Sequence, residues 1–161
     1  MSTAPIALFA YNRPDHLEQT IAALKLNALA KQSDLYIYSD GPRSLDQAWA
    51  VAEVRRLIAD VSGFKSVTVV ERNNNWGLAN SIIDGVTQLC KKYGKVIVLE
   101  DDLLSEPNFL VYMNIALERY ENEDQVMQIS GFNFPLDIYS EMNSFFLPLT
   151  TSWGWATWER S

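Results

Sequence analysis

Three consecutive acidic residues, Glu100, Asp101 and Asp102, follow directly after the apolar residues 96–99. Adjacent carboxylates repel one another, so their proton affinity rises and the fold loses stability unless a cation neutralises them. Divalent metal ions that prefer oxygen ligands are natural partners for such a group. We therefore interpret residues 100–102, the acidic turn, as a candidate metal and phosphate site. The alternative is an ordinary surface turn.

Three further groups of polar residues each follow a short apolar segment that predicts a strand. They are Ala10, Tyr11 and Arg13 after residues 6–9, Asp40 after residues 35–38, and Asn75, Gly77 and Asn80 after residues 67–70. The carboxyl ends of parallel strands share one edge of a sheet, where open α/β folds bind ligands. We therefore expect these groups to meet the acidic turn in one crevice.

Each group has a functional and a structural interpretation. Arg13 presents a planar cation to a phosphate or a base carbonyl, or it forms a surface ion pair. Asp40 accepts hydrogen bonds from a uracil-like imide or a ribose, or it is a plain turn aspartate. In residues 73–80 an asparagine is expected to cap a helix whose amino end faces an anion, with Asn80 near the same ligand. A capped helix in which Gly77 allows close packing is the structural alternative.

Apolar residues at helical spacing lie between the predicted strands and indicate helices that begin at Pro14, Ser44, residue 78 and Ser105. Ser44 and Ser105 are expected to act as helix caps, with Pro107 in the first turn of the last helix. Residues 126–130 predict one more strand. This alternation predicts an α/β fold with a mainly parallel central sheet and helices on both faces.

Composition bounds the possible functions. The 161 residues are 48% hydrophobic and carry a net charge of −7, which suits one domain and argues against non-specific binding of nucleic acid. No apolar run approaches the roughly 18 residues of a membrane span, and no signal peptide is visible. The single cysteine, Cys90, is expected to be a buried thiol. We expect a cytoplasmic protein.

Several enzyme classes are excluded by their missing motifs. His16, the single histidine, rules out zinc sites with several histidines, and it is expected to face solvent. The glycine-rich motifs of dinucleotide-binding proteins and of NTPases are absent. The nucleophile elbow of serine hydrolases is absent as well.

The last part of the chain, residues 132–161, is rich in aromatic residues, among them Trp153, Trp155 and Trp158. Aromatic faces of this kind either stack on sugar rings or pack in a core. We predict a loop-like aromatic segment that follows an α/β core of residues 1–131 within a single domain, 1–161. Because the chain stops at Ser161, we expect a molecule truncated before an acceptor-binding region.

Four stretches together resemble the GT-A type glycosyltransferases, close to glycosyltransferase family 2 and in particular to the N-acetylglucosaminyltransferase I-like group. They are Ala10-Tyr-Asn-Arg-Pro14, Asn75-Trp-Gly-Leu-Ala-Asn80, Glu100-Asp-Asp-Leu103 with Glu106-Pro-Asn-Phe109, and Ser152-Trp-Gly-Trp-Ala-Thr-Trp158. The resemblance implies the Rossmann-like fold of nucleotide-diphospho-sugar transferases. It also implies transfer of a sugar from a nucleoside-diphosphate sugar, with UDP favoured, to a glycan hydroxyl.

The resemblance further implies residue roles. Arg13 and Asp40 would hold the base and ribose, and Glu100 and Asp101 would lie near the ribose and donor sugar. Asp102 would bind Mn²⁺ or Mg²⁺, which stabilises the departing diphosphate while the acceptor attacks and inverts the anomeric centre. The catalytic base of similar enzymes lies beyond the position that corresponds to Ser161, so the catalytic residue stays unknown.

Two other functions stay open. The first is a non-catalytic domain that binds a nucleotide or a sugar. The second is a sugar nucleotidyltransferase, which is disfavoured because such enzymes carry a glycine-rich loop after the first strand, where this chain has Tyr11-Asn-Arg-Pro14.

Overall fold

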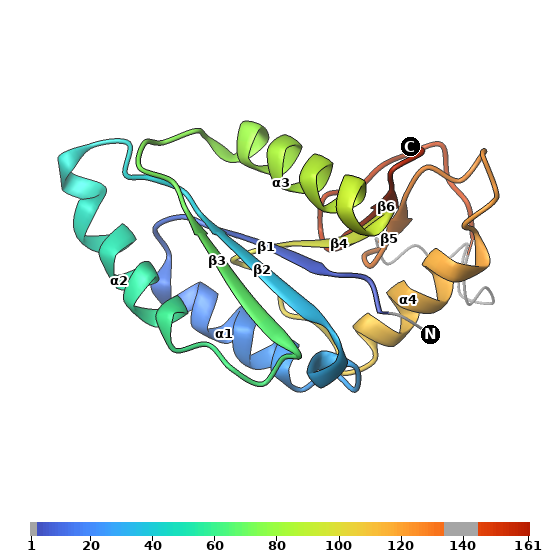
Figure 1. Cartoon of the computed structure of the whole chain (residues 1–161), viewed down its shortest axis with the longest axis horizontal. Helices are drawn as coiled ribbons and strands as arrows, with labels where there is room; N and C mark the ends of the chain where they lie inside the picture. Colours follow the sequence, from blue (N-terminus) through green and yellow to red (C-terminus); the bar gives the residue numbers. More distant parts are fainter. Residues whose placement is uncertain (1–2, 134–144) are drawn as a thin grey trace.

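The computed structural model describes residues 3–133 and 145–161. Within these residues, one sheet has the strand order β3-β2-β1-β4-β6-β5 (Figure 1). The strands are β1 (Ile6–Ala10), β2 (Asp34–Ser39), β3 (Ser66–Glu71), β4 (Lys95–Glu100), β5 (Ile129–Ser130) and β6 (Trp155–Trp158). The strands from β3 to β4 are parallel, and β6 is antiparallel to both β4 and β5. The predicted mainly parallel sheet is confirmed.

Helices cover both faces of the sheet, as predicted (Figure 1). They are α1 (Pro14–Lys25), α2 (Ala48–Ala59), α3 (Leu78–Tyr93) and α4 (Phe109–Arg119), with short 3₁₀ turns η1 (Ala30–Gln32) and η2 (Leu45–Gln47). Apolar residues from α1, α2 and α4 share one core with one face of the sheet, and α3 packs on the other face. Gly94, in the left-handed conformation, ends α3 where the sequence predicts.

Alternating residues of β1 show how the sheet separates the two cores. Ile6 and Leu8 belong to the core beneath α1, α2 and α4, whereas Ala7 and Phe9 belong to the core beneath α3. The apolar residues 96–99 of β4 are all buried, as expected for a parallel strand covered on both faces. This arrangement fixes the direction in which the acidic turn leaves the sheet.

Two predicted helix caps are wrong. Ser44 makes no capping hydrogen bond and precedes the 3₁₀ turn η2. Helix α4 begins at Phe109, after Ser105. Asn27 is the reason: its side-chain oxygen accepts the Leu110 N–H at 2.9 Å, and its Nδ2 donates to Ser105 Oγ at 3.1 Å. A buried asparagine that follows the C-terminal end of α1 thus does what Ser105 was expected to do.

The aromatic segment is more ordered than the predicted loop. Residues 155–158 form β6, which lies in the sheet between β4 and β5. Trp158 is buried, and its indole N–H donates to the Leu117 carbonyl at 3.1 Å. Strand β5 is shorter than predicted. Phe134 and Tyr139 of this segment lie outside the described residues, and the division of the domain at residue 131 stays a prediction.

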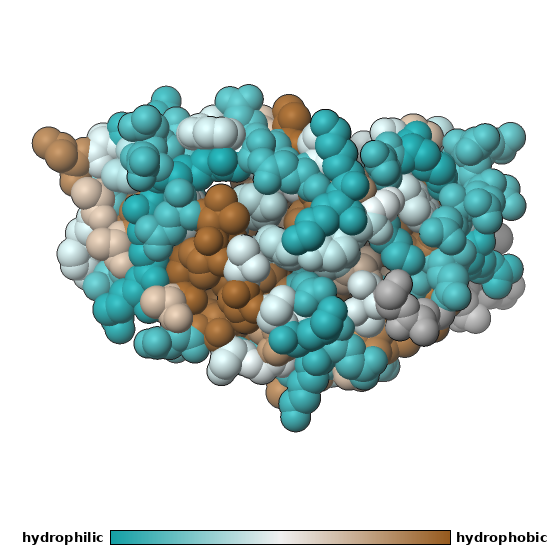
Figure 2. All heavy atoms as spheres, viewed as in Figure 1, coloured by the Kyte–Doolittle hydropathy of each residue, from teal (hydrophilic) through white to brown (hydrophobic). Residues whose placement is uncertain are grey.

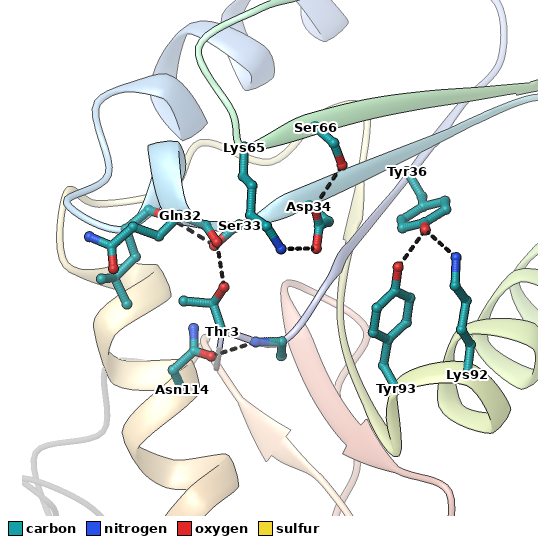
Figure 3. A network of polar contacts seen from close by, with 12 residues as sticks. Thr3, Gln32, Ser33, Asp34, Tyr36, Lys65, Ser66, Lys92, Tyr93 and Asn114 are labelled. Carbon is teal, nitrogen blue, oxygen red and sulfur yellow. Dashed lines mark hydrogen bonds and ion pairs between the residues drawn. The ribbon is translucent and has the colours of Figure 1, made fainter. Parts of the chain in front are cut away.

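The amino ends of the parallel strands lie at the edge opposite the candidate site. There the Asp34 carboxylate accepts hydrogen bonds from Lys65 Nζ and Ser66 Oγ, and the hydroxyls of Tyr36 and Tyr93 lie 2.6 Å apart (Figure 3). Figure 2 shows hydrophobic surface in the region of the edge strand β3, where Val69 is 36% exposed. The functional residues predicted from the sequence do not lie at the amino ends of the parallel strands.

Three smaller predictions can be compared with the structure. Cys90 is buried, and burial raises the pKa of its thiol to about 11, which makes a nucleophilic role unfavourable. His16 is exposed, as expected. Across residues 3–133 and 145–161, no helix is both long and apolar enough to cross a membrane. A cytoplasmic location stays a prediction.

Candidate functional site

The four polar turns meet at the carboxyl edge of the sheet. The Tyr11 backbone N–H donates to Asp101 Oδ2 at 3.1 Å. The Arg13 guanidinium pairs with both Asp101 and Asp102, with 2.8 Å between Nη1 and the Asp102 carboxylate. Asp40, after β2, contacts the turn that follows β3. Segments distant in sequence therefore form one site, as the strand order requires.

A cavity of about 450 Å³ lies at this meeting point. Eight residues predicted from the sequence line it: Ala10, Tyr11, Arg13, Asp40, Asn75, Gly77, Glu100 and Asp101. Phe9, Asn12, Tyr38, Arg43, Leu78 and Ser81 complete the lining. Asn80 is outside the cavity, where its side-chain amide donates to the Trp76 carbonyl at 2.8 Å. The structure therefore does not bring Asn80 to this cavity, and its position beside a ligand stays a prediction.

The floor of the cavity is a row of three residues from adjacent strands. Tyr38 and Glu100 both pair with Phe9 in the parallel register, so the three side chains share the face of the sheet covered by α3. The rings of Phe9 and Tyr38 stack with centroids 4.9 Å apart. A Cβ on Gly85 would lie 2.9 Å from either ring, so this glycine lets α3 approach the floor.

Asp101 anchors the acidic turn within the protein. Its side chain is almost fully buried and is held by Arg13 and the Tyr11 N–H, while its backbone carbonyl accepts the Thr20 hydroxyl at 3.0 Å. Burial raises the pKa of Asp101, and the contacts with Tyr11 and Arg13 oppose that shift. Asp101 therefore fixes the direction of the turn, and α1 contributes through Thr20.

Glu100 is the least compensated acid of the turn. Burial raises the pKa of its carboxyl, the charges of Asp102 and Asp101 raise it further, and Arg13 opposes them. Among the described residues its carboxylate has no hydrogen-bond partner. A ligand that brings positive charge to the cavity would relieve this cost.

A further prediction follows for Glu100. A raised pKa adds stability below the unfolded-state pKa, and this stability is lost as the pH rises through the folded-state pKa. Glu100→Gln removes the ionised form, so we expect the melting temperature of the ligand-free protein to rise by a few degrees at about pH 7 and to stay unchanged at about pH 3. Calorimetry at both pH values measures this. Glu118→Gln, at an exposed position of α4, is the control; an equal rise in both variants contradicts the interpretation.

The acids do not surround one metal position. Within the described ranges, no three His, Cys, Asp or Glu side chains are grouped to hold a metal ion, so residues 100–102 do not by themselves form a metal site, and metal binding stays a prediction. Arg13 supplies the neutralising charge instead. Asp102 has a side chain 39% exposed with one oxygen on Arg13. Mg²⁺ is commonly held by one or two carboxylates together with substrate phosphates. The exposed Asp102 and Glu100, whose carboxylate has no hydrogen-bond partner among the described residues, fit that donor set.

Asp40 is used by the protein itself. Its Oδ1 accepts the Gly41 and Trp76 N–H groups at 2.9 and 2.8 Å. Its Oδ2 accepts the Gly77 N–H at 2.9 Å and Asn75 Nδ2 at 3.1 Å. A carboxylate has about four acceptor positions, so the protein itself occupies them all, and the contact of Asp40 with a base or ribose stays a prediction. Asp40 instead holds the turn before α3 against the end of β2.

This contact also changes the predicted anion site. Asp40 is itself the anion at the amino end of α3, where a ligand phosphate was expected. No asparagine caps the helix; Gly77, with a φ of 75°, is its first flanking residue. Asn75 instead donates to the Gly41 carbonyl at 2.9 Å. A Cβ on Gly41 would lie 2.5 Å from the Asn74 backbone, so glycine is required at this approach.

Sequence reasoning missed two residues, Thr20 and Ser81, and the contacts of the Tyr11 hydroxyl. Thr20 carries no local signal, because its partner lies across the sheet edge on the acidic turn. The Tyr11 hydroxyl accepts the Arg43 N–H at 3.0 Å and donates to Gln47, which holds the loop after β2. Ser81 lies on the buried face of α3 with Gly85 and Leu89. The four-residue spacing of these three positions could have placed Ser81 on the buried face of the helix from the sequence.

The fold is similar to that of a solved glycosyltransferase. In three dimensions the chain is similar to the mannosyltransferase PcManGT from Pyrobaculum calidifontis, solved in complex with GDP-Man and Mn²⁺, with a TM-score of 0.64 and 15% sequence identity. The similarity covers 98% of this chain and 45% of that one. The chain therefore has the fold of a glycosyltransferase, and the predicted fold class is confirmed.

Sequence similarity leads to a more particular relative. The chain is 23% identical over 182 aligned positions to the alpha-1,3-mannosyl-glycoprotein 2-beta-N-acetylglucosaminyltransferase of Arabidopsis thaliana. The alignment covers 99% of this chain and 39% of the relative. The resemblance to the N-acetylglucosaminyltransferase I-like group is thus confirmed. No protein-family model matches the chain. The chain spans less than half the length of each of these two relatives.

Proposed function

We propose that this chain is the donor-binding part of a glycosyltransferase, which transfers a sugar from a nucleoside-diphosphate sugar to a hydroxyl of a glycan acceptor. The observation that carries the proposal is the convergence of Arg13, the first two acids of the acidic turn and the aromatic rings of the floor on one cavity at the carboxyl edge of the sheet, with Asp102 held beside it by Arg13. The similarity to two glycosyltransferases supports it.

The cavity suggests how a donor would lie. Phe9, Tyr38 and Leu78 offer apolar surface for a base. Arg13 suits the diphosphate, because a guanidinium forms paired hydrogen bonds with phosphate oxygens. In the ligand-free protein this guanidinium is held by the acidic turn, so its position is already set.

Asp102 is the residue that we propose to hold Mn²⁺ or Mg²⁺, and Glu100 lies close enough in the chain to assist it. When bound, such an ion would act as a Lewis acid on the departing diphosphate. We propose that transfer inverts the anomeric centre, which requires a carboxylate base to take the acceptor proton. We assign no residue of this chain to that role.

A second cavity, of about 460 Å³, lies beyond the acidic turn and suits a carbohydrate. Phe109, Tyr112, Phe132 and Trp153 line it together with Glu106. Aromatic rings stack on the apolar faces of sugars, and a carboxylate accepts their hydroxyls. We propose that this cavity binds a sugar during the reaction. Trp158, by contrast, is buried and packs in the core.

A thermal-shift panel tests the proposal. With Mn²⁺ or Mg²⁺ present, we expect UDP, GDP or dTDP to raise the melting temperature, with UDP giving the largest rise. A ligand at 100 times its dissociation constant adds about 2.7 kcal/mol of stability, which corresponds to several degrees for a domain of this size. The absence of a shift with all three diphosphates would contradict donor binding. Binding without measurable transfer or donor hydrolysis would favour the non-catalytic alternative.

A further inference from the structure

One buried hydroxyl in the cavity wall has no partner. Ser81 is 5% exposed, and its Oγ makes no hydrogen bond. Among the described residues, the other buried side-chain polar atom without a partner is Arg72 Nε. Ser81 lines the cavity from the first turns of α3, one helical turn before Gly85, whose Cβ position lies against the Phe9 and Tyr38 rings.

A buried polar group without a hydrogen bond makes the fold less stable. Alanine has the higher helix propensity, so the fold gains nothing obvious from serine at this position. A ligand in the cavity that forms a hydrogen bond with the hydroxyl would remove this cost.

The surroundings indicate which part of a ligand that is. Ser81 stands over the aromatic floor, where a planar base would lie, whereas Arg13 and Asp101 mark the charged side of the cavity. Two other acids line the cavity near the floor. Asp40 has its four acceptor positions filled, and an ionised Glu100 can only accept hydrogen bonds. A hydroxyl can both donate and accept, so it can pair with an imide N–H or a carbonyl at the edge of a base.

We propose that the Ser81 hydroxyl hydrogen-bonds the polar edge of the base of the nucleoside diphosphate and is a specificity-determining residue. The inference rests on the proposed function and adds to it the group that selects the base. A base without a matching group leaves the hydroxyl unpaired, which is how a polar site rejects an analogue.

Ser81→Ala tests this with two opposite effects. We expect the melting temperature of the ligand-free protein to rise by a few degrees, because an unpartnered hydroxyl is removed. We expect the dissociation constant of the preferred nucleoside diphosphate to rise about 5- to 20-fold. Titration calorimetry with Mn²⁺ measures it, and inorganic pyrophosphate, which lacks a base, should bind both proteins equally.

Ser33→Ala is the matched control. Ser33 is fully buried at the opposite edge of the sheet (Figure 3). Its Oγ donates to the Leu29 carbonyl at 3.0 Å. This variant should lose stability and keep the nucleotide affinity of the unchanged protein.

Three outcomes would overturn the inference. If the unchanged protein binds a nucleoside diphosphate and Ser81→Ala binds it equally well, the hydroxyl does not read the base. If Ser81→Ala loses stability as Ser33→Ala does, the fold itself uses the hydroxyl. If the unchanged protein binds no nucleoside diphosphate, the proposed function fails, and the inference fails with it.

Discussion

Asp40→Asn is expected to lower the free energy of unfolding by about 3–5 kcal/mol. The Asp40 carboxylate accepts four N–H groups, two of them from the Trp76 and Gly77 backbone. An asparagine side chain keeps one acceptor oxygen and turns an NH₂ group toward donors, so about half of these charge-assisted bonds are lost. Urea denaturation followed by circular dichroism measures the change.

The same variant should also lose nucleotide binding, because the turn before α3 forms part of the cavity wall. Asp124→Ala is the control: this aspartate is exposed, and its replacement should change the unfolding free energy by less than about 0.5 kcal/mol. A similarly small effect of Asp40→Asn would show that the turn holds its place without the carboxylate.

Asp102→Ala should have the largest effect on ligand binding. We expect the affinity for a nucleoside diphosphate in the presence of Mn²⁺ to fall by more than about 100-fold, since even the supporting groups of a metal ligand are worth 10- to 100-fold. The fold should remain stable, because Arg13 keeps its pair with the buried Asp101 and exposed ion pairs contribute about 1 kcal/mol at most. Titration calorimetry with and without Mn²⁺ separates the two effects.

Glu18→Ala removes an exposed acid of α1 and should leave the Mn²⁺-dependent affinity unchanged. If Asp102→Ala keeps that affinity as well, Asp102 is not the metal ligand, and the acidic turn acts through Arg13 alone.

Local patterns in the sequence were sufficient for most of the architecture. The apolar residues of β4 and the helical spacing in α3 predicted both elements, because each pattern is complete within one segment. The position of the turns at one edge then followed from the geometry of parallel strands. Eight predicted residues accordingly line the cavity.

The parts that could not be predicted depend on partners far apart in sequence. Asp40 and Trp76 are separated by 36 positions, and Asn27 caps a helix 83 positions away. Aspartate and asparagine are common in local turns and helix caps, so the neighbouring sequence does not show that Asp40 and Asn27 bind distant segments instead. The sequence analysis expected a bound metal ion to neutralise the acidic turn, because nothing near the turn in the sequence indicates a cation. Arg13 supplies the positive charge from 88 positions away.

The place of β6 in the sheet has a consequence for how the chain matures on the ribosome. Residues 155–158 pair with residues 95–98 of β4, so this apolar strand keeps one row of unpaired backbone donors and acceptors until those late residues have been translated. An unpaired strand edge invites pairing with another nascent chain. Expression products that stop before Trp155 should therefore collect in inclusion bodies, because the edge of β4, the strand that leads into the acidic turn, stays unpaired.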